Sequence, residues 1–223
     1  MAWTYQDARA AARRRLPHML FEYIDSGAFD ERTLAANPAG WGKLRLMQRV
    51  MRDMSKLDLT ADMAGGTASI PVALGPVGFA GMYARRGEVQ AARAAASEGV
   101  PFCLSAVSVC DYEEVCRKSG TAPWFQLYMI RDRAYMGDLI DRVLAVGART
   151  MVFTVDMPLP GIRHRDGRSG LYDTGPGGFV RQAWQGIGRP GWLWDVYLRG
   201  RPHGFGNFAA AMPGRTGLGD YWR

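Results

Sequence analysis

The sequence predicts an α/β fold made of about the first four units of a (β/α)8 TIM barrel, with an N-terminal helical extension and a long loop after strand four. Short apolar runs alternate with helical stretches between residues 69 and 157, and this alternation is typical of parallel strands joined by crossover helices. The runs begin close together, near residues 69, 101, 122 and 150. A complete barrel needs eight units and about 250 residues, so only about half a barrel is expected.

The N-terminal stretch has the pattern of two short helices. Thr4 is followed three residues later by an acid, which is a capping box that starts a helix. The Ala- and Arg-rich residues that follow favour a helix until Pro17 breaks it. A second helix is expected from Met19 to Ser26, with Gly27 as a left-handed cap. Residues 37–68 show no regular pattern and are expected to form an irregular lid.

The barrel half is expected over residues 69–157. Its strands are expected at residues 69–76, 101–106, 122–129 and 150–156, and its helices at residues 88–97, 112–118 and 132–146. The regular pattern then fails, because residues 158–223 are rich in Gly, Pro, Arg and Trp. A structureless stretch this long is normally a functional loop or a disordered segment. The chain is therefore divided into an extension and lid (1–68), a half-barrel (69–157) and a partly disordered loop (158–223).

Composition excludes several classes of protein. Hydrophobic residues make up 48% and charged residues 22%, which is typical of a globular chain. The net charge of +7 favours anionic partners, but no nucleic-acid reading motif accompanies it, so no nucleic acid is expected. Three isolated histidines give no metal cage. Three cysteines without a CxxC pair favour reduced thiols and a cytoplasmic location, and neither a signal peptide nor a run of about 20 apolar residues is present.

Polar side chains lie at the carboxyl ends of the expected strands, where barrels of this kind build their sites. The first strand ends in Gly75–Gly78, and the next three carry Ser105, then Gln126 and Tyr128, then Thr154 and Asp156. Residues two apart in a strand share a face, so these side chains predict a common ligand site. The alternative is that the neutral ones only satisfy buried backbone groups.

Six colinear segments resemble the FMN-dependent 2-hydroxy-acid oxidase and dehydrogenase family. They are Phe21–Ala28, Gly75–Gly78, Met82–Glu88, Trp124–Tyr128, Phe153–Pro158 and Pro160–Asp166. Within that family, Met82–Glu88 and Gly200–His203 look most like the bacterial respiratory L-lactate dehydrogenases. The resemblance runs from about residue 5 to Asp220.

The resemblance implies that the site holds FMN. The cofactor-binding residues would be Pro76, Val77, Gly78, Ser105, Gln126 and Thr154. The backbone of residues 76–78 would lie against the flavin ring. The three polar side chains would hydrogen-bond the ring and tune its electronics.

The resemblance also assigns substrate and catalytic roles. Tyr23 would bind the substrate carboxylate, and Tyr128 would contact the substrate oxygen. Arg163 would bind the carboxylate through its planar, always charged fork. Asp156 would orient the catalytic histidine and stabilise its charged form. The alternatives are that Tyr23 only finishes a helix, that Tyr128 is a core-edge aromatic, and that one of the nearby arginines meets the substrate instead.

These roles imply oxidation of a 2-hydroxy acid, most simply L-lactate to pyruvate, with electrons passed on to quinone or another acceptor. The family's histidine base, second arginine and lysine belong to later strands that this sequence does not show, and His203 lies in the expected loop. The chain is therefore expected to be inactive alone and active within a full-length parent, which would form a homo-oligomer. Glycolate and mandelate are rival substrates. The alternative function is a non-catalytic basic fragment that binds a membrane or a partner.

Residues 179–201 interleave arginines with Trp and Tyr side chains. Aromatic side chains favour a membrane interface and arginines favour anionic headgroups. We therefore expect peripheral contact with the inner face of the cell membrane. The alternative is that the tryptophans pack on their own protein or on a neighbouring subunit.

Overall fold

The computed structural model describes residues 3–130, 132–156 and 161–209. The chain divides into two units, each built from two stretches that are distant in sequence. A helical unit combines Met1–Leu57 with Leu159–Trp194, and a sheet unit combines Asp58–Pro158 with Asp195–Arg223. These divisions differ from the expected boundaries at residues 68 and 157, because the stretch after the last strand contributes to both units.

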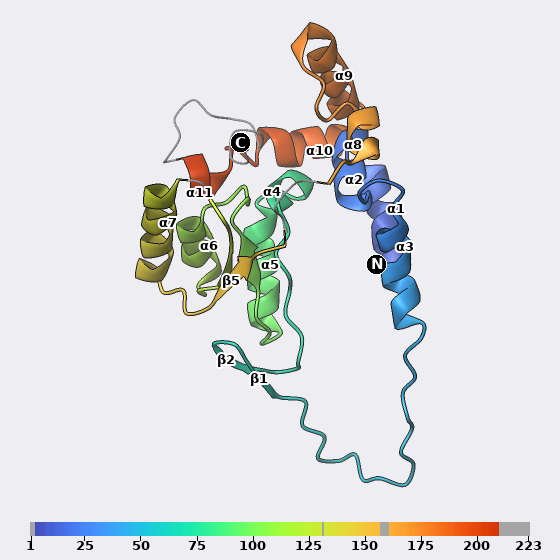
Figure 1. Cartoon of the computed structure of the whole chain (residues 1–223), viewed down its shortest axis with the longest axis vertical. Coiled ribbons are helices and arrows are strands. Elements are labelled where there is room, and N and C mark those ends of the chain that lie inside the picture. The colour runs from blue at the N-terminus through green and yellow to red at the C-terminus, as the bar shows by residue number, and fades with distance from the viewer. Residues whose placement is uncertain (1–2, 131, 157–160, 210–223) are drawn as a thin grey trace. The chain divides into compact units, whose positions relative to one another are not determined.

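The helical unit contains six helices among the described residues (Figure 1). They are α1 (Tyr5–Arg15), α2 (His18–Asp25), α3 (Arg32–Trp41), α8 (His164–Ser169), α9 (Gly175–Ile187) and α10 (Pro190–Trp192). The expected capping box of α1 is confirmed, since the Asp7 N–H donates to Thr4 Oγ1 at 3.2 Å and the Thr4 N–H donates to Asp7 Oδ2 at 3.1 Å. Residues 42–60 have no regular structure, so the irregular stretch begins later than expected.

The left-handed cap expected at Gly27 is wrong. The chain leaves α2 through Ser26 in an extended conformation, and the Ser26 N–H donates to the Glu22 carbonyl at 2.9 Å. The Gly27 N–H donates to Glu31 Oε1 at 3.0 Å. Because a side chain supplies this acceptor, the helix ends without the reversal that a left-handed glycine provides.

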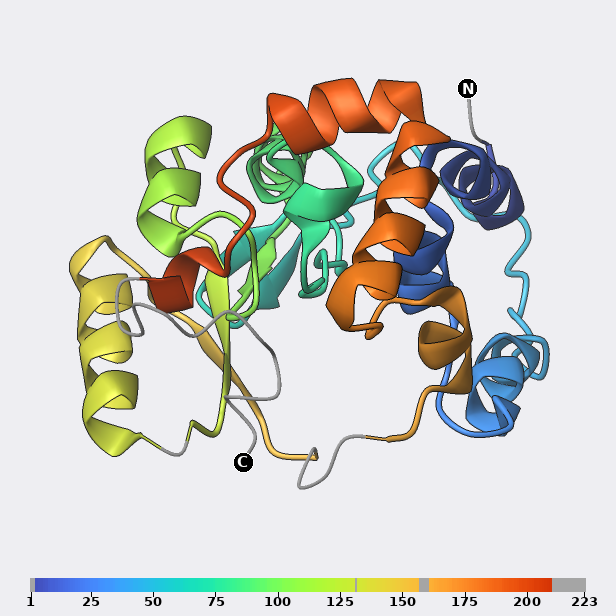
Figure 2. The ribbon, with the colours of Figure 1, turned by 90° about the horizontal axis from the view of Figure 1, so that it is seen from above.

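The sheet unit holds three parallel strands in the order β3 (Cys103–Ser105), β4 (Trp124–Tyr128) and β5 (Met151–Thr154). The helices α5 (Gly87–Ser97), α6 (Tyr112–Ser119) and α7 (Arg133–Ala145) alternate with them, after the short α4 (Ala80–Tyr83) (Figure 2). An antiparallel hairpin of β1 (Ala61–Met63) and β2 (Gly66–Ala68) precedes them. The expected alternation of parallel strands and helices is confirmed.

The strand expected at residues 69–76 is reduced to a single bridge. Leu74 pairs with Phe102, with its N–H donating to the Pro101 carbonyl at 2.8 Å. Pro71 and Pro76 flank this point and have no N–H to donate. A ladder cannot extend through either residue.

The core of the sheet unit lies between the three strands and their helices. Its largest fully buried apolar side chains include Leu104, Tyr112, Phe125, Leu127 and Leu139. Fully burying one such side chain stabilises the fold by about 1.5–3 kcal/mol. Phe205 and Phe208 join this core beside α11 (Gly206–Ala209).

The long structureless loop expected after residue 157 is wrong over residues 161–209. This stretch contains α8, α9, α10, a π-helix η1 (Leu193–Leu198) and α11. Proline stands in the first turn of both α9 and α10, where it favours a helix start. Trp192 and Val196 are buried. The remaining residues of the expected loop, 158–160 and 210–223, lie outside the described residues.

Candidate functional site

Three of the expected cofactor-binding side chains form one hydrogen-bonded chain across the sheet. The Ser105 hydroxyl donates to Gln126 Oε1 at 3.1 Å, and Gln126 Nε2 donates to Thr154 Oγ1 at 2.9 Å. The strand register makes this possible, because Ser105 stands opposite Gln126 in parallel neighbouring strands. Ser105 and Gln126 are buried and Thr154 is half-buried. The structure therefore brings together the last residues of β3 and β5 and the middle residue of β4.

The hydrogen-bonded side chains of Ser105, Gln126 and Thr154 offer both donors and acceptors, all of them neutral. Gln126 Oε1 also accepts from the Ala106 N–H at 3.3 Å, so the side chain does satisfy a buried backbone group as well. Its amide nitrogen carries two hydrogens, and the hydroxyl of Thr154 carries one that is not used in accepting from Gln126. A ring that presents carbonyl oxygens and N–H groups matches such a set of donors and acceptors.

The backbone around Gly78 lies beside the same end of β3. The Phe79 N–H donates to the Val107 carbonyl at 3.0 Å. A Cβ on Gly78 would stand 3.0 Å from Val107 Cγ2, which is tighter than ordinary van der Waals contact. Pro76 and Val77 are exposed. Residues 76–78 thus form an exposed backbone stretch next to the loop that follows Ser105.

Tyr128 lies at the end of β4, opposite Thr154 of β5. Burial, and then the negative charge of Asp156, raise the pKa of Tyr128. The phenol therefore stays neutral and keeps its hydrogen over the physiological pH range. Asp156 is exposed two residues beyond β5, so its carboxylate is accessible to a further polar partner.

Tyr23 and Arg163 meet inside the helical unit. The Arg163 guanidinium lies over the Tyr23 ring, 4.7 Å from its centroid. Arg163 Nη2 donates to the Tyr23 carbonyl and, at 2.8 Å, to Ser26 Oγ. Its Nε lies 3.0 Å from Asp166 Oδ2, and that carboxylate is fully buried. The two expected substrate residues therefore occupy one cluster, with the guanidinium held largely by its own unit.

The neighbouring arginines have other roles. Arg165 bonds to Glu22, to Asp25 Oδ2 at 2.8 Å and to Glu31 Oε1 at 3.2 Å. Arg168 is exposed, and its carbonyl accepts from Arg181. The Arg165 guanidinium is thus held by three carboxylates of its own unit, and Arg163 as the substrate-side arginine stays a prediction.

Sequence reasoning missed Asn207. This side chain is fully buried beside β3, where its amide nitrogen donates to the Ala106 carbonyl at 3.2 Å and to Ser108 Oγ at 2.9 Å. No periodic pattern marks it, because α11 spans a single short turn. The nearest signal is Gly206, where a Cβ would stand 2.3 Å from the Asp111 backbone nitrogen. Only glycine permits so close an approach to α6.

The family described as FMN-dependent dehydrogenase matches residues 12–216. The chain belongs to the FMN-dependent dehydrogenase family. The resemblance drawn from the six segments is thereby confirmed, and the expected cofactor, FMN, is the cofactor of this family. Among the described residues, no three His, Cys, Asp or Glu side chains are grouped as a metal site would need.

Curated relatives in this FMN-dependent family carry the name L-lactate dehydrogenase. That of Caulobacter sp. is 55% identical over 215 residues, which cover 96% of this chain and 56% of that protein. That of Ectopseudomonas mendocina is 51% identical over the same span. The chain therefore spans about half the length of the curated relatives it matches.

Two solved structures are also similar to the chain. A monotopic membrane protein, (S)-mandelate dehydrogenase, is 29% identical with a TM-score of 0.84, over 94% of this chain and 56% of its own. A mandelate oxidase crystallised with 3,3-difluoro-2-hydroxy-3-phenylpropionic acid is 35% identical with a TM-score of 0.71, over 78% of this chain and 51% of its own. This likeness confirms the α/β fold class.

Proposed function

We propose that this chain forms the first half of a (β/α)8 barrel in an enzyme that uses FMN to oxidise a small 2-hydroxy acid. The observation that carries the proposal is the hydrogen-bonded chain of Ser105, Gln126 and Thr154, which joins the ends of β3 and β5 through the middle of β4. The open backbone of residues 76–78 beside it gives a flat ring a place to lie. Satisfying buried backbone groups accounts for the Ala106 N–H on Gln126, but it does not use the second amide hydrogen of Gln126 or the hydroxyl hydrogen of Thr154.

The chain's own residues would hold FMN by shape and by neutral hydrogen bonds. Gly78 lets the backbone of residues 76–78 pack closely against Val107, and Gln126 and Thr154 supply hydrogen-bond donors. Bound FMN would supply the two-electron acceptor for the hydroxy acid, which the amino-acid side chains lack. A buried neutral network can bind a ring without the desolvation cost of a charge.

Four side chains have proposed roles in binding and oxidising the substrate. Tyr128, kept protonated, would hydrogen-bond the oxygen at the carbon being oxidised. Tyr23 and Arg163 would bind the carboxylate, and Asp156 would orient the histidine that removes a proton. That histidine, a second arginine and a lysine are expected in the part of the relatives that this chain does not match. We therefore propose that the 223-residue chain does not turn over substrate by itself.

L-lactate is the first candidate substrate. Relatives that are 51–55% identical carry the name L-lactate dehydrogenase, whereas the mandelate enzymes among the solved structures are 29–36% identical. The product would be pyruvate, with electrons passed to quinone or another acceptor.

The test uses the full-length protein that contains this chain. It should purify yellow with about one FMN per polypeptide, and L-lactate should bleach the flavin under anaerobic conditions while pyruvate accumulates. Glycolate and (S)-mandelate should bleach it more slowly. Absence of bound flavin would exclude the enzyme class, and faster bleaching by mandelate would exclude only the lactate assignment.

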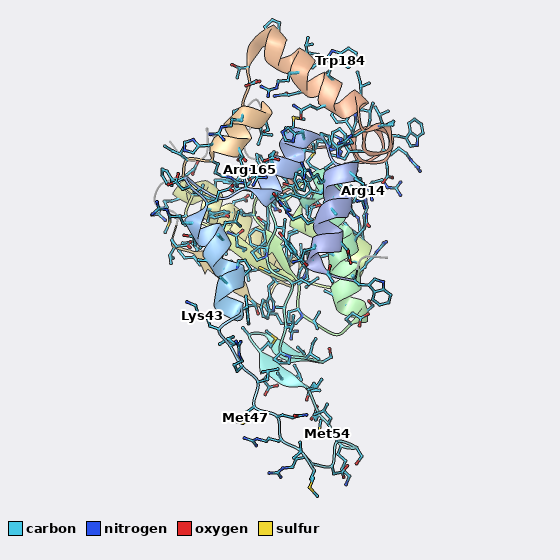
Figure 3. All side chains as sticks on the ribbon, turned by 90° about the vertical axis from the view of Figure 1, so that its right-hand side faces the viewer. Arg14, Lys43, Met47, Met54, Arg165 and Trp184 are labelled. Carbon is cyan, nitrogen blue, oxygen red and sulfur yellow. The ribbon has the colours of Figure 1, made fainter. Side chains whose placement is uncertain are left out.

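A membrane contact is proposed for α9, because its exposed face is apolar. Phe179, Val180, Trp184 and Ile187 share one face and are 73%, 52%, 68% and 56% exposed, and Trp184 projects from the helix in Figure 3. An ordinary surface helix shows the opposite arrangement, with its polar face outward. Aromatic side chains on such a face suit the headgroup boundary of a bilayer.

The inner face of α9 is held by glutamines. Gln182 Nε2 donates to the Gly170 carbonyl at 2.9 Å, and Gln185 Oε1 accepts from the Met19 N–H at 2.7 Å. Because these hydrogen bonds hold the polar side of α9 against its own unit, its apolar side is left to contact the inner face of the cell membrane, and the proposed attachment needs no spanning segment. No helix in the described ranges is long and apolar enough to cross a bilayer. Unlike Trp184, Trp192 is buried and packs on its own unit.

A neighbouring subunit of a homo-oligomer is the alternative partner for the apolar face of α9.

A further inference from the structure

Asn207 connects three parts of the sheet unit through one buried side chain. It is fully buried, and its Oδ1 accepts from the Tyr112 N–H at the start of α6 at 2.9 Å. Its amide nitrogen donates to the Ser105 carbonyl at 3.4 Å, to the Ala106 carbonyl at 3.2 Å and to Ser108 Oγ at 2.9 Å. The side-chain amide is thus directed at the end of β3 and at the start of α6.

The backbone that Asn207 holds is the one that directs the candidate cofactor site. Residues 105–108 carry the Ser105 hydroxyl that donates to Gln126 and the Val107 carbonyl that accepts from Phe79. A shift of this turn would move the hydroxyl and the Gly78 backbone together. Phe205 reaches the same place, since its ring centroid lies 4.5 Å from that of Phe79.

We propose that Asn207 is a positioning residue for the FMN site. It holds the turn at residues 105–108 in the conformation that aims the Ser105–Gln126–Thr154 chain and the backbone of residues 76–78 at the ring. The proposal rests on the proposed function, because it assumes that these groups bind FMN.

The segment around Asn207 is anchored by other contacts. Arg86 Nη1 donates to the Pro202 carbonyl at 3.1 Å and to the Gly200 carbonyl at 3.4 Å, and Arg86 is itself ion-paired with Glu114. Phe205 and Phe208 lie in the core. These contacts do not involve the side-chain amide, so a substitution at Asn207 should leave the segment docked.

The test compares variants of the full-length protein, stripped of flavin and titrated with FMN. Asn207→Asp keeps the Oδ1 acceptor but replaces the donating nitrogen with an anionic oxygen beside two carbonyls. It should weaken FMN binding about tenfold or more and change the visible absorption bands of the bound flavin. Asn207→Ser is the milder second variant, should Asn207→Asp fail to fold, and it should weaken binding in the same direction.

Tyr135→Phe is the matched control. The Tyr135 hydroxyl donates to the Asn207 backbone carbonyl, so this variant loses a buried hydrogen bond at the same residue without touching the side-chain amide. It should lower the melting temperature yet leave the FMN affinity within about twofold and the flavin spectrum unchanged. Unchanged affinity and spectrum in both Asn207 variants would overturn the proposal, as would an equal loss of affinity in Tyr135→Phe. Failure of the unsubstituted protein to bind FMN would instead overturn the proposed function.

Discussion

Gln126 Nε2 donates to Thr154 Oγ1 at 2.9 Å, so a side chain of β4 joins β5 in addition to the backbone ladder. The same amide accepts from Ser105 of β3. Three strands are thereby linked at one edge by a network whose members depend on one another. Such networks are rigid when complete and costly when broken.

Removing this amide should damage both fold and cofactor binding. Gln126→Leu preserves approximate size but leaves the Ser105 hydroxyl and the Ala106 N–H without their acceptor. We expect the free energy of unfolding to fall by about 1–3 kcal/mol and FMN affinity to fall at least about tenfold. Urea unfolding and FMN titration of the full-length protein measure the two effects.

Tyr112→Phe is the control for that substitution. The buried Tyr112 hydroxyl donates to the Pro123 carbonyl at 2.7 Å, which is at the opposite end of β4. Its loss should lower stability by about 1 kcal/mol and spare FMN binding. Equal losses of FMN affinity in the two variants would contradict a site at the carboxyl ends of the strands.

Arg163 and Arg165, two positions apart in the sequence, should respond differently to the same change. Arg163→Lys removes the planar fork over Tyr23, so the KM for L-lactate should rise about tenfold. Arg165→Lys breaks contacts to three carboxylates and should lower stability while leaving KM within about twofold. Steady-state kinetics and thermal unfolding separate the two. A larger KM increase in Arg165→Lys would reverse the substrate assignment.

Membrane contact should depend on the outward face of α9. Trp184→Gln, combined with Phe179→Gln, should sharply reduce sedimentation of the full-length protein with anionic vesicles, because both side chains are exposed on that face. Trp41→Gln is the control, since Trp41 is 76% exposed on α3. Deleting residues 179–201 is a poorer test, because it would also remove the buried Trp192 and Val196. Unchanged partitioning of the α9 variant would exclude α9 as the contact.

Acid should destabilise the helical unit through Asp25. The pKa of Asp25 lies below its ordinary value of 3.8, mainly because Arg9 donates a hydrogen bond to its carboxylate. A hydrogen bond from Arg165 lowers the pKa further. A carboxyl group with a lowered pKa in the folded state stabilises the fold above its unfolded pKa and loses that contribution as pH falls through the folded pKa. The free energy of unfolding should therefore decline below about pH 5.

Asp25→Asn should be less stable than the unsubstituted protein at pH 7 and should show a flatter decline in acid. Asp30→Asn is the control, because Asp30 is 77% exposed and lies 3.8 Å from its partner Arg32. Urea unfolding between pH 3 and 7 checks both variants. Parallel pH profiles for the unsubstituted protein and Asp25→Asn would contradict the assignment.

Local patterns predicted the sheet unit well, because its elements are set by short-range chemistry. The strand expected at residues 122–129 and the helix expected at residues 132–146 are present as β4 and α7, and the carboxylate of Asp132 accepts from the Tyr135 N–H at 3.0 Å at the start of that helix. The strand expected at 69–76 failed because prolines interrupt an otherwise apolar run. The polar side chains at the carboxyl ends could be placed together for the same reason, since parallel strands bring equivalent positions to one edge.

Long-range partners were not visible in the sequence. Asn207 meets residues about a hundred positions earlier, with 102 positions separating it from Ser105, and no local pattern encodes that contact. The helices after residue 161 were missed because Gly, Pro and Trp dominate the stretch. Their order depends on contacts such as Gln185 with Met19, which are 166 positions apart.

The inward glutamines of α9 have a practical consequence for handling the protein. Rotating α9 to bury its apolar face would break the hydrogen bonds of Gln182 and Gln185 to the rest of the helical unit. The apolar face therefore stays exposed in the isolated protein. In aqueous buffer without detergent, protein molecules should then self-associate through this face. Mild detergent or short-chain lipid should disperse such clusters, and light scattering before and after its addition would reveal them.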